Sequence, residues 1–185
     1  MDKEYEKLAE VKESSKEIFD GKILHLFEDQ VGLVNGKTAS REVIRHIGAV
    51  CIIPVTDDNQ VYVERQFRYP INQVITEIPA GKLDYKDENR LDAAKRELRE
   101  ETGLSAEKWT ELGDFFPAAA YCDERITMYL AQGLSMGETD LDDDEFIDIQ
   151  LVPLKQLVEE VMSGKIKDSK TQIAILKADK LLGDC

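Results

Sequence analysis

Three glutamates, Glu97, Glu100 and Glu101, lie within five residues of one another in this 185-residue chain. A helix turns by about 100° per residue, so Glu100 would stand about 60° to one side of Glu97 and Glu101 about 40° to the other. Carboxylates this close together repel one another, and a divalent cation relieves the repulsion by taking their oxygens as ligands. The spacing therefore indicates a site for a cation such as Mg²⁺, which in turn could bind phosphate oxygens.

The segment around these glutamates is predicted to be a helix from near Glu88 to near Gly103, because glycine is favoured just after a helix. Leu91, Ala94 and Leu98 would form an apolar face beside the carboxylates. A helix rich in Glu, Arg and Lys is more often a solvated surface helix with ion pairs four residues apart. This short segment alone leaves both interpretations open.

The longer stretch from Gly81 to Leu104 favours the functional interpretation. It reads GKLDYKDENRLDAAKRELREETGL. This stretch resembles the Nudix box, whose pattern is G, five residues, E, seven residues and REUxEExGU, where U is aliphatic. Every fixed position from Glu88 onward matches. Six residues separate Gly81 from Glu88, so the loop before the helix carries one extra residue.

The resemblance implies a Nudix hydrolase, in which water breaks a nucleoside diphosphate linkage with the help of Mg²⁺, or of Mn²⁺ as a possible substitute. Glu97 and Glu101 match the principal metal ligands, and the backbone carbonyl of Ala80 matches a further one. Glu100 matches either another ligand or a catalytic contact to water at the metal. In this chemistry the metal polarises phosphoryl oxygens and lowers the pKa of water.

Shorter pieces look like the ADP-ribose pyrophosphatase branch of that family: QFRYP, EIPAGKL, DDDEFIDIQLVPL and SGKIKDSKT. The branch cleaves ADP-ribose to AMP and ribose 5-phosphate, generally as a homodimer that exchanges N-terminal strands and builds each site from both subunits. The resemblance therefore implies a homodimer in which residues 15–46 are exchanged. It divides the chain into an N-terminal antiparallel strand unit, residues 1–46, and a Nudix hydrolase domain, residues 47–185.

The same resemblance implies further site residues outside the box. Arg68 matches a substrate-contacting arginine, Arg41 one that reaches the partner subunit's substrate, and Glu124 a substrate-contacting glutamate. In the acidic run TDLDDDEF, Glu145 matches a carboxylate that orients or deprotonates water, and Asp143 is the second candidate. Taken alone, Arg68 could form an ordinary surface ion pair and the acidic run could be a solvated loop.

Three alternative functions stay open. The branch usually carries Ser-Pro-Gly where this chain has Ala118, Ala119 and Ala120, so another nucleoside diphosphate sugar could be the substrate. The chain could instead be a non-catalytic sensor that binds ADP-ribose, although such relatives often lose carboxylates that are all present here. A hydrolase of free nucleoside triphosphates is the third alternative, and the extra N-terminal strands argue against it.

The remaining elements predict an α+β fold. The Asn35-Gly36 pair is a strong hairpin signal within the N-terminal strands. Further strands are expected on both sides of a polar turn at residues 57–60, before Pro79, and at about residues 107–116, 125–132 and 146–152, with closing helices near 153–163 and 168–182. This order indicates a mixed α/β arrangement, and the Nudix resemblance implies a mixed β-sheet sandwiched between helices.

Composition limits the partners and the location. The chain is 42% hydrophobic and 34% charged, as in soluble globular proteins, and its net charge of −14 disfavours nucleic acids and anionic membranes. No apolar run is long enough for a membrane span or a signal peptide, and the three cysteines lack CxxC spacing. We expect a cytoplasmic protein whose partner is a small nucleoside diphosphate.

Overall fold

The computed structural model describes residues 3–141 and 146–183. The elements follow in chain order: η1 (Lys3–Leu8), β1 (Val11–Asp20), β2 (His25–Gly32), β3 (Thr38–Arg45), β4 (Ala49–Pro54), β5 (Gln60–Arg68), η2 (Tyr69–Ile71), β6 (Gln73–Glu77), β7 (Ala80–Lys82), α1 (Arg90–Thr102), β8 (Leu104–Phe115), β9 (Ile126–Met136), β10 (Ile147–Pro153), α2 (Leu154–Met162) and α3 (Ser169–Gly183). The predicted helices lie within two residues of these bounds. Strand β1 begins earlier than expected, because it pairs with β2 along most of its length.

The chain divides into two units. The first comprises residues 1–47 together with 118–124, and the second comprises residues 48–117 together with 125–185. The inclusion of 118–124 in the first unit was not expected, since this segment lies far from the N-terminal strands in the sequence. Its backbone pairs with β3: Ile44 N donates to Tyr121 O (2.7 Å), and Asp123 N donates to Ile44 O (3.1 Å).

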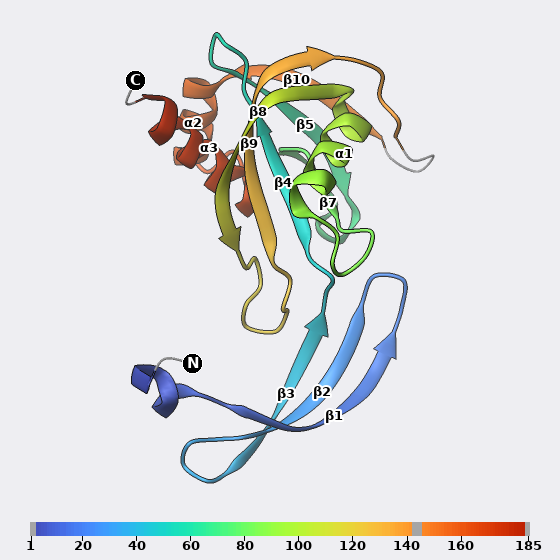
Figure 1. Cartoon of the computed structure of the whole chain (residues 1–185), viewed down its shortest axis with the longest axis vertical. Helices are drawn as coiled ribbons and strands as arrows, with labels where there is room; N and C mark the ends of the chain where they lie inside the picture. The colour runs from blue at the N-terminus through green and yellow to red at the C-terminus, as the bar shows by residue number, and fades with distance from the viewer. Residues whose placement is uncertain (1–2, 142–145, 184–185) are drawn as a thin grey trace. The chain divides into compact units, whose positions relative to one another are not determined.

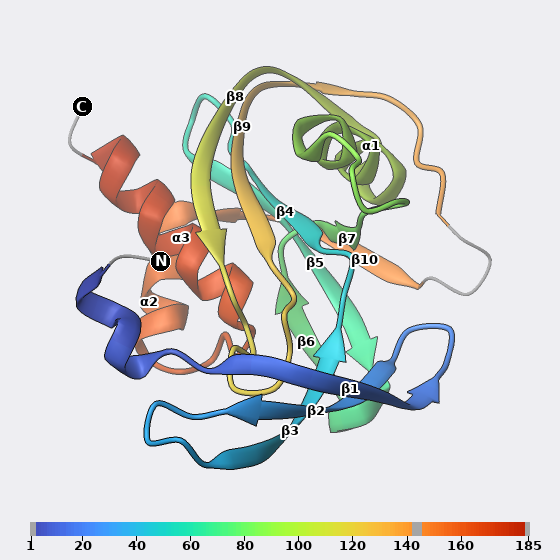
Figure 2. The same cartoon turned by 60° about the horizontal axis from the view of Figure 1, so that its bottom comes forward.

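The first unit is a three-stranded antiparallel sheet in the order β1-β2-β3 (Figures 1 and 2). The turn between β2 and β3 contains the predicted Asn35-Gly36 pair, and Gly36 has a φ of +76°, which glycine adopts without a steric cost. The buried carboxylate of Asp29 on β2 accepts from the Ser15 hydroxyl (2.5 Å) and from Arg45 Nη2 (2.9 and 3.0 Å). These contacts link the three strands.

The second unit contains a mixed sheet in the order β7-β4-β9-β8, in which only β4 and β9 are parallel, and an antiparallel sheet in the order β10-β5-β6. Strand β4 is buried along its whole length. Alternate residues of β4 face opposite sides, so Val50 and Ile52 pack in the cluster of α1, while Cys51 and Ile53 pack in the cluster of α2 and α3.

Figure 1 accordingly shows β4 between α1 and the α2–α3 pair. The predicted α+β class, with a mixed sheet sandwiched between helices, is confirmed. Among the residues that the structure describes, no helix has both the length and the apolar character that a membrane crossing requires.

Candidate active site

Helix α1 is fixed at both ends and along one face. The Asn89 side chain accepts from the backbone N of Leu91 (3.0 Å) and of Asp92 (3.1 Å), which caps the first turn. At the other end Gly103 has a φ of +71°, and its N donates to Arg99 O (2.8 Å). The apolar face packs in the core with three buried side chains, Ala93, Ala94 and Leu98. The rotation of the helix about its axis is therefore set, and with it the direction of the glutamates.

Two of the three predicted glutamates meet at the backbone of β7. Glu101 is only 8% exposed, and its Oε2 accepts from Ala80 N (2.9 Å). The carboxyl of Glu97 lies directly over Gly81, where an added Cβ would stand 2.1 Å from Glu97 Cδ. Glycine is therefore required for this close approach. The structure thus brings the side chains of Glu97 and Glu101 to the backbone of Ala80 and Gly81.

Glu100 has different neighbours. Its carboxylate accepts from Arg96 Nη1 (3.2 Å) and from Arg99 Nη2 (3.4 Å). Its backbone O accepts from Asp140 N (2.9 Å), which joins α1 to the segment that precedes the acidic run. Equal spacing on the helix did not give equal surroundings, because two arginines flank Glu100.

Arg96 is surrounded by carboxylates. Its guanidinium pairs with Asp84 (3.3 Å), Glu88 (3.5 Å), Glu97 (2.8 Å) and Glu100 (3.2 Å). Burial lowers the pKa of Arg96, but the charges and hydrogen bonds of these carboxylates outweigh it and raise the pKa well above its usual range. Arg96 thus offsets part of the repulsion on α1.

Glu88 follows the loop that carries the extra residue, and its side chain has partners in that loop and on α1. Glu88 Oε2 accepts from Asp84 N (2.7 Å) and lies 3.5 Å from Arg96 Nη2. Glu88 thus contacts the same arginine as the box glutamates Glu97 and Glu100.

The oxygen atoms at β7 are of the type that a divalent cation binds. Within residues 3–141 and 146–183, no three acidic, histidine or cysteine side chains form a ready-made metal site. The carboxylates of Glu97 and Glu101 and the Ala80 carbonyl nevertheless offer the oxygen donors that hard cations bind. Gly81 leaves the Glu97 carboxyl room beside them. These residues fit a divalent cation.

Arg68 interacts electrostatically with Glu101, one of these carboxylates. Burial lowers the pKa of its guanidinium, but hydrogen bonds from Arg68 to Glu77, together with the charges of Glu77, Asp168 and Glu101, raise the pKa overall. Nε and Nη2 of Arg68 donate to Glu77 Oε2 at 2.9 and 2.5 Å. A cation that can bind phosphate therefore stands near the predicted metal ligand Glu101.

Glu77 was missed by the sequence analysis, together with Lys170 and Asp168, although all three lie in segments quoted for the family resemblance. A carboxylate at the end of β6, directly before the apolar Ile78, was the available signal for Glu77. No pattern in the sequence indicated its partner Lys170, since the two are 93 residues apart.

The other predicted site residues lie in the first unit or outside the described residues. Arg41 pairs with Glu10 through two hydrogen bonds (3.0 and 2.5 Å), and Glu124 lies 3.7 Å from His46 Nδ1, all within the first unit. Glu10 was not anticipated. Both candidates for the catalytic base, Asp143 and Glu145, lie outside the described residues.

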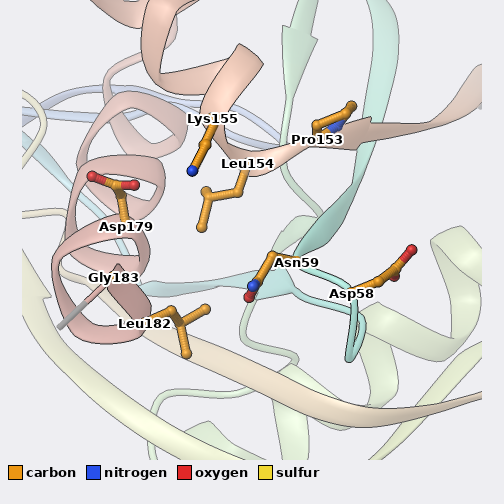
Figure 3. Close-up of a pocket in the computed structure, with 8 residues that line it drawn as sticks. All are labelled: Asp58, Asn59, Pro153, Leu154, Lys155, Asp179, Leu182 and Gly183. Atoms are coloured by element: carbon orange, nitrogen blue, oxygen red, sulfur yellow. The ribbon is translucent and has the colours of Figure 1, made fainter. Parts of the chain in front are cut away.

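A separate cavity of about 320 Å³ lies between the β4–β5 turn and the helices α2 and α3 (Figure 3). Asn59, Leu154, Lys155, Asp179 and Leu182 are among its lining residues. None of the residues that line this cavity belongs to α1 or β7, so it is not the carboxylate site. The candidate site consists of the carboxylates on α1 and Arg68, and none of these residues lines the cavity.

Comparison with known proteins agrees with this geometry. Residues 45–172 match the model of the NUDIX domain. The chain belongs to the Nudix family. It is 40% identical over 164 residues to an ADP-ribose pyrophosphatase of Bacillus subtilis, with 88% of each chain covered. It is 41% identical over 163 residues to a methanol dehydrogenase activator of Bacillus methanolicus, with 87% of this chain and 88% of the relative covered.

Among solved structures, the crystal structure of an ADP compounds hydrolase superposes with a TM-score of 0.84 at 20% identity, and the match covers 95% of each chain. This likeness establishes the Nudix fold.

Replacing Gly81 with Ala should displace the Glu97 carboxyl while leaving the fold intact, because the atoms that must move are the end of one flexible side chain. We expect the affinity for Mn²⁺, measured by calorimetry, to fall by roughly tenfold or more. The free energy of unfolding in urea should change by less than about 1 kcal/mol.

Gly183→Ala is the matched control, since an added Cβ there meets nothing within 4 Å. Unchanged Mn²⁺ affinity in Gly81→Ala would show that Glu97 takes no part in binding the ion.

Proposed function

We propose that this Nudix protein is a Mg²⁺-dependent hydrolase that converts ADP-ribose and water to AMP and ribose 5-phosphate. The observation that carries the proposal is the placement of Glu97 and Glu101 against β7, with Arg68 near Glu101. A cation site beside a guanidinium is complementary to a diphosphate, which carries negative charge on both phosphoryl groups. The name of the Bacillus subtilis relative supports ADP-ribose as the substrate.

In the proposed mechanism, the residues of the site divide the work of binding and proton transfer. Mg²⁺, when bound, supplies charge that stabilises the phosphoryl oxygens and makes water more acidic. Glu97, Glu101 and the Ala80 carbonyl hold the cation, and Arg68 binds and orients the diphosphate oxygens. Water attacks one phosphorus, the bond from that phosphorus to the bridging oxygen breaks, and the other phosphate leaves.

A carboxylate must accept the proton of the attacking water. We assign this role to Glu145, with Asp143 as the second candidate, because the acidic run follows the segment that is tied to Glu100 through Asp140 N. Glu100 is proposed as a further ligand or as a contact to the attacking water. The Glu100 carboxylate would then be shared between its present partners, Arg96 and Arg99, and the bound cation or its water.

A second candidate function follows from the Bacillus methanolicus relative, whose name describes the activation of another enzyme. This function need not exclude hydrolysis, and it parallels the alternative of an ADP-ribose-binding sensor. We favour hydrolysis because Glu97, Glu100 and Glu101 are all retained. Another nucleoside diphosphate sugar remains the alternative substrate.

The proposal includes a homodimer in the cytoplasm, with residues 1–46 exchanged between subunits as a unit separate from the hydrolase domain, 47–185. All ten residues of β1 are exposed, including Val11, Ile18 and Phe19. Exposed apolar side chains on one strand are typical of a surface that binds another chain.

The cysteines support the proposed location in the cytoplasm. The thiols of Cys51 and Cys122 are free, as in reducing compartments.

Wild-type protein with Mg²⁺ should release AMP from ADP-ribose, and Glu101→Gln should lower that rate by at least roughly 100-fold, because it removes a ligand charge. A panel of nucleoside diphosphate sugars and triphosphates, with products identified by chromatography, checks both expectations. Glu159→Gln is the control, since Glu159 is exposed on α2.

Binding of ADP-ribose by calorimetry without any product would favour the sensor. Turnover of triphosphates alone would reject the ADP-ribose assignment.

Co-expression of two inactive variants tests whether each site uses both subunits. Arg41→Ala and Glu101→Gln should each be inactive alone, but half of randomly formed dimers are mixed, and one site in each mixed dimer is intact. About one quarter of wild-type activity should therefore return in the unfractionated mixture, and about one half in mixed dimers that are isolated through two different tags. No recovery in a verified mixed dimer would mean that Arg41 serves its own subunit.

A further inference from the structure

A chain of buried charges joins helix α3 to Arg68. The Glu77 side chain is only 5% exposed, and its two oxygens bind different cations. Oε2 accepts from Arg68 Nε (2.9 Å) and Nη2 (2.5 Å), and Oε1 accepts from Lys170 Nζ (3.0 Å). Lys170 lies in the first turn of α3, and thus one carboxylate connects α3 with the end of β5.

Lys170 is itself held in place. Its Nζ also lies 3.1 Å from Asp168 Oδ2, which accepts from the backbone N (2.9 Å) and the hydroxyl (2.6 Å) of Thr171. The Thr171 hydroxyl oxygen in turn accepts from Ile78 N (3.0 Å). The start of α3 therefore binds both the side chain of Glu77 and the backbone of the residue that follows it.

The charges of this network balance, since Arg68 and Lys170 are cations and Glu77 and Asp168 are anions. Loss of one member would leave a buried charge without full compensation, which is strongly unfavourable. Of the four, Arg68 is the most exposed, at 42% of its side chain, while Lys170 is 11% exposed. Nε and Nη2 bind Glu77, which leaves Nη1 as the nitrogen that a phosphate oxygen could reach.

We propose that Lys170 is a positioning residue for substrate binding, which holds Arg68 in place through Glu77. By sharing the charge of Glu77, Lys170 keeps that carboxylate fixed and leaves part of the Arg68 charge for the diphosphate. This inference rests on the proposed function, because it takes Arg68 as the group that contacts the diphosphate.

The physical reason is the behaviour of Glu77 when its second cation is missing. The carboxylate would then either draw the Arg68 guanidinium more fully onto itself or become protonated and no longer hold the guanidinium. In both cases Arg68 loses the orientation that Glu77 now gives it. A purely structural role, in which Lys170 only fastens α3 to β6, would not depend on Arg68.

Steady-state kinetics with ADP-ribose separate these two roles. Lys170→Met should raise KM about tenfold and change kcat much less, because Arg68 contacts the substrate before and during the reaction. Lys170→Arg keeps the cation and should restore most of the affinity. The control is Lys167→Met: this exposed lysine donates to Gln73 Oε1 (3.0 Å) on β6, the strand that carries Glu77, and should leave KM unchanged.

A double-mutant cycle then links the effect to Arg68. Once Arg68 is replaced by Ala, Lys170→Met should raise KM little further. An equal rise of KM with and without Arg68 would overturn the proposal. If Lys170→Met does not fold, the double variant Glu77→Gln, Lys170→Met leaves the interior neutral and tests whether Arg68 depends on this carboxylate. KM should again rise about tenfold, and an unchanged KM would overturn the proposal.

A readout without substrate separates this inference from the proposed function. We expect one Nε–Hε signal in the NMR spectrum, assigned to Arg68 by its loss in Arg68→Lys, to shift or vanish in Lys170→Met. It should persist in Lys170→Arg and Lys167→Met. An unchanged signal in Lys170→Met overturns the positioning role, whatever the chain hydrolyses. If the wild type shows no turnover but the Arg68 signal still shifts in Lys170→Met, only the proposed function is rejected.

Discussion

The structure depends on two like charges that are held against one short stretch of backbone. Glu97 and Glu101 both reach the Ala80–Gly81 segment of β7, where Glu101 accepts one backbone N–H and Glu97 fits only because Gly81 lacks a side chain. Carboxylates in such proximity raise the energy of the folded chain unless cations offset them. The rest of the second unit can be understood as the means of keeping this arrangement.

The core of the second unit fixes the direction of the glutamates. Strand β4 is buried on both faces, so α1 packs on one side of it while α2 and α3 pack on the other. The cap at Asn89 and the left-handed Gly103 set where α1 begins and ends. A helix held at its ends and along its apolar face cannot rotate, and its last turn therefore faces β7.

Two arginines reduce the repulsion between the carboxylates of Glu97 and Glu101. Arg96 pairs with Glu97, and Arg68 interacts electrostatically with Glu101.

Much of this arrangement could be predicted from local sequence. Gly103 gave the end of α1, the Asn35-Gly36 pair gave the β2–β3 turn, and helical spacing placed Glu97 and Glu101 on one face. The same spacing could not show that Glu100 turns to Arg96 and Arg99, because the angle on a helix does not specify competing neighbours. Local patterns also failed for contacts between distant segments. Residues 118–124 pair with β3, and Lys170 pairs with a carboxylate 93 residues away, and both depend on the finished fold.

The most direct test of the account is a crystal structure with Mn²⁺ bound, in which anomalous scattering locates the ion. The account predicts an ion about 2.1 Å from oxygens of Glu97, Glu101 and the Ala80 carbonyl, the distance typical of octahedral Mg²⁺ sites. An ion bound elsewhere, or one held at β7 without either glutamate, would contradict the claim that these two carboxylates form the metal site.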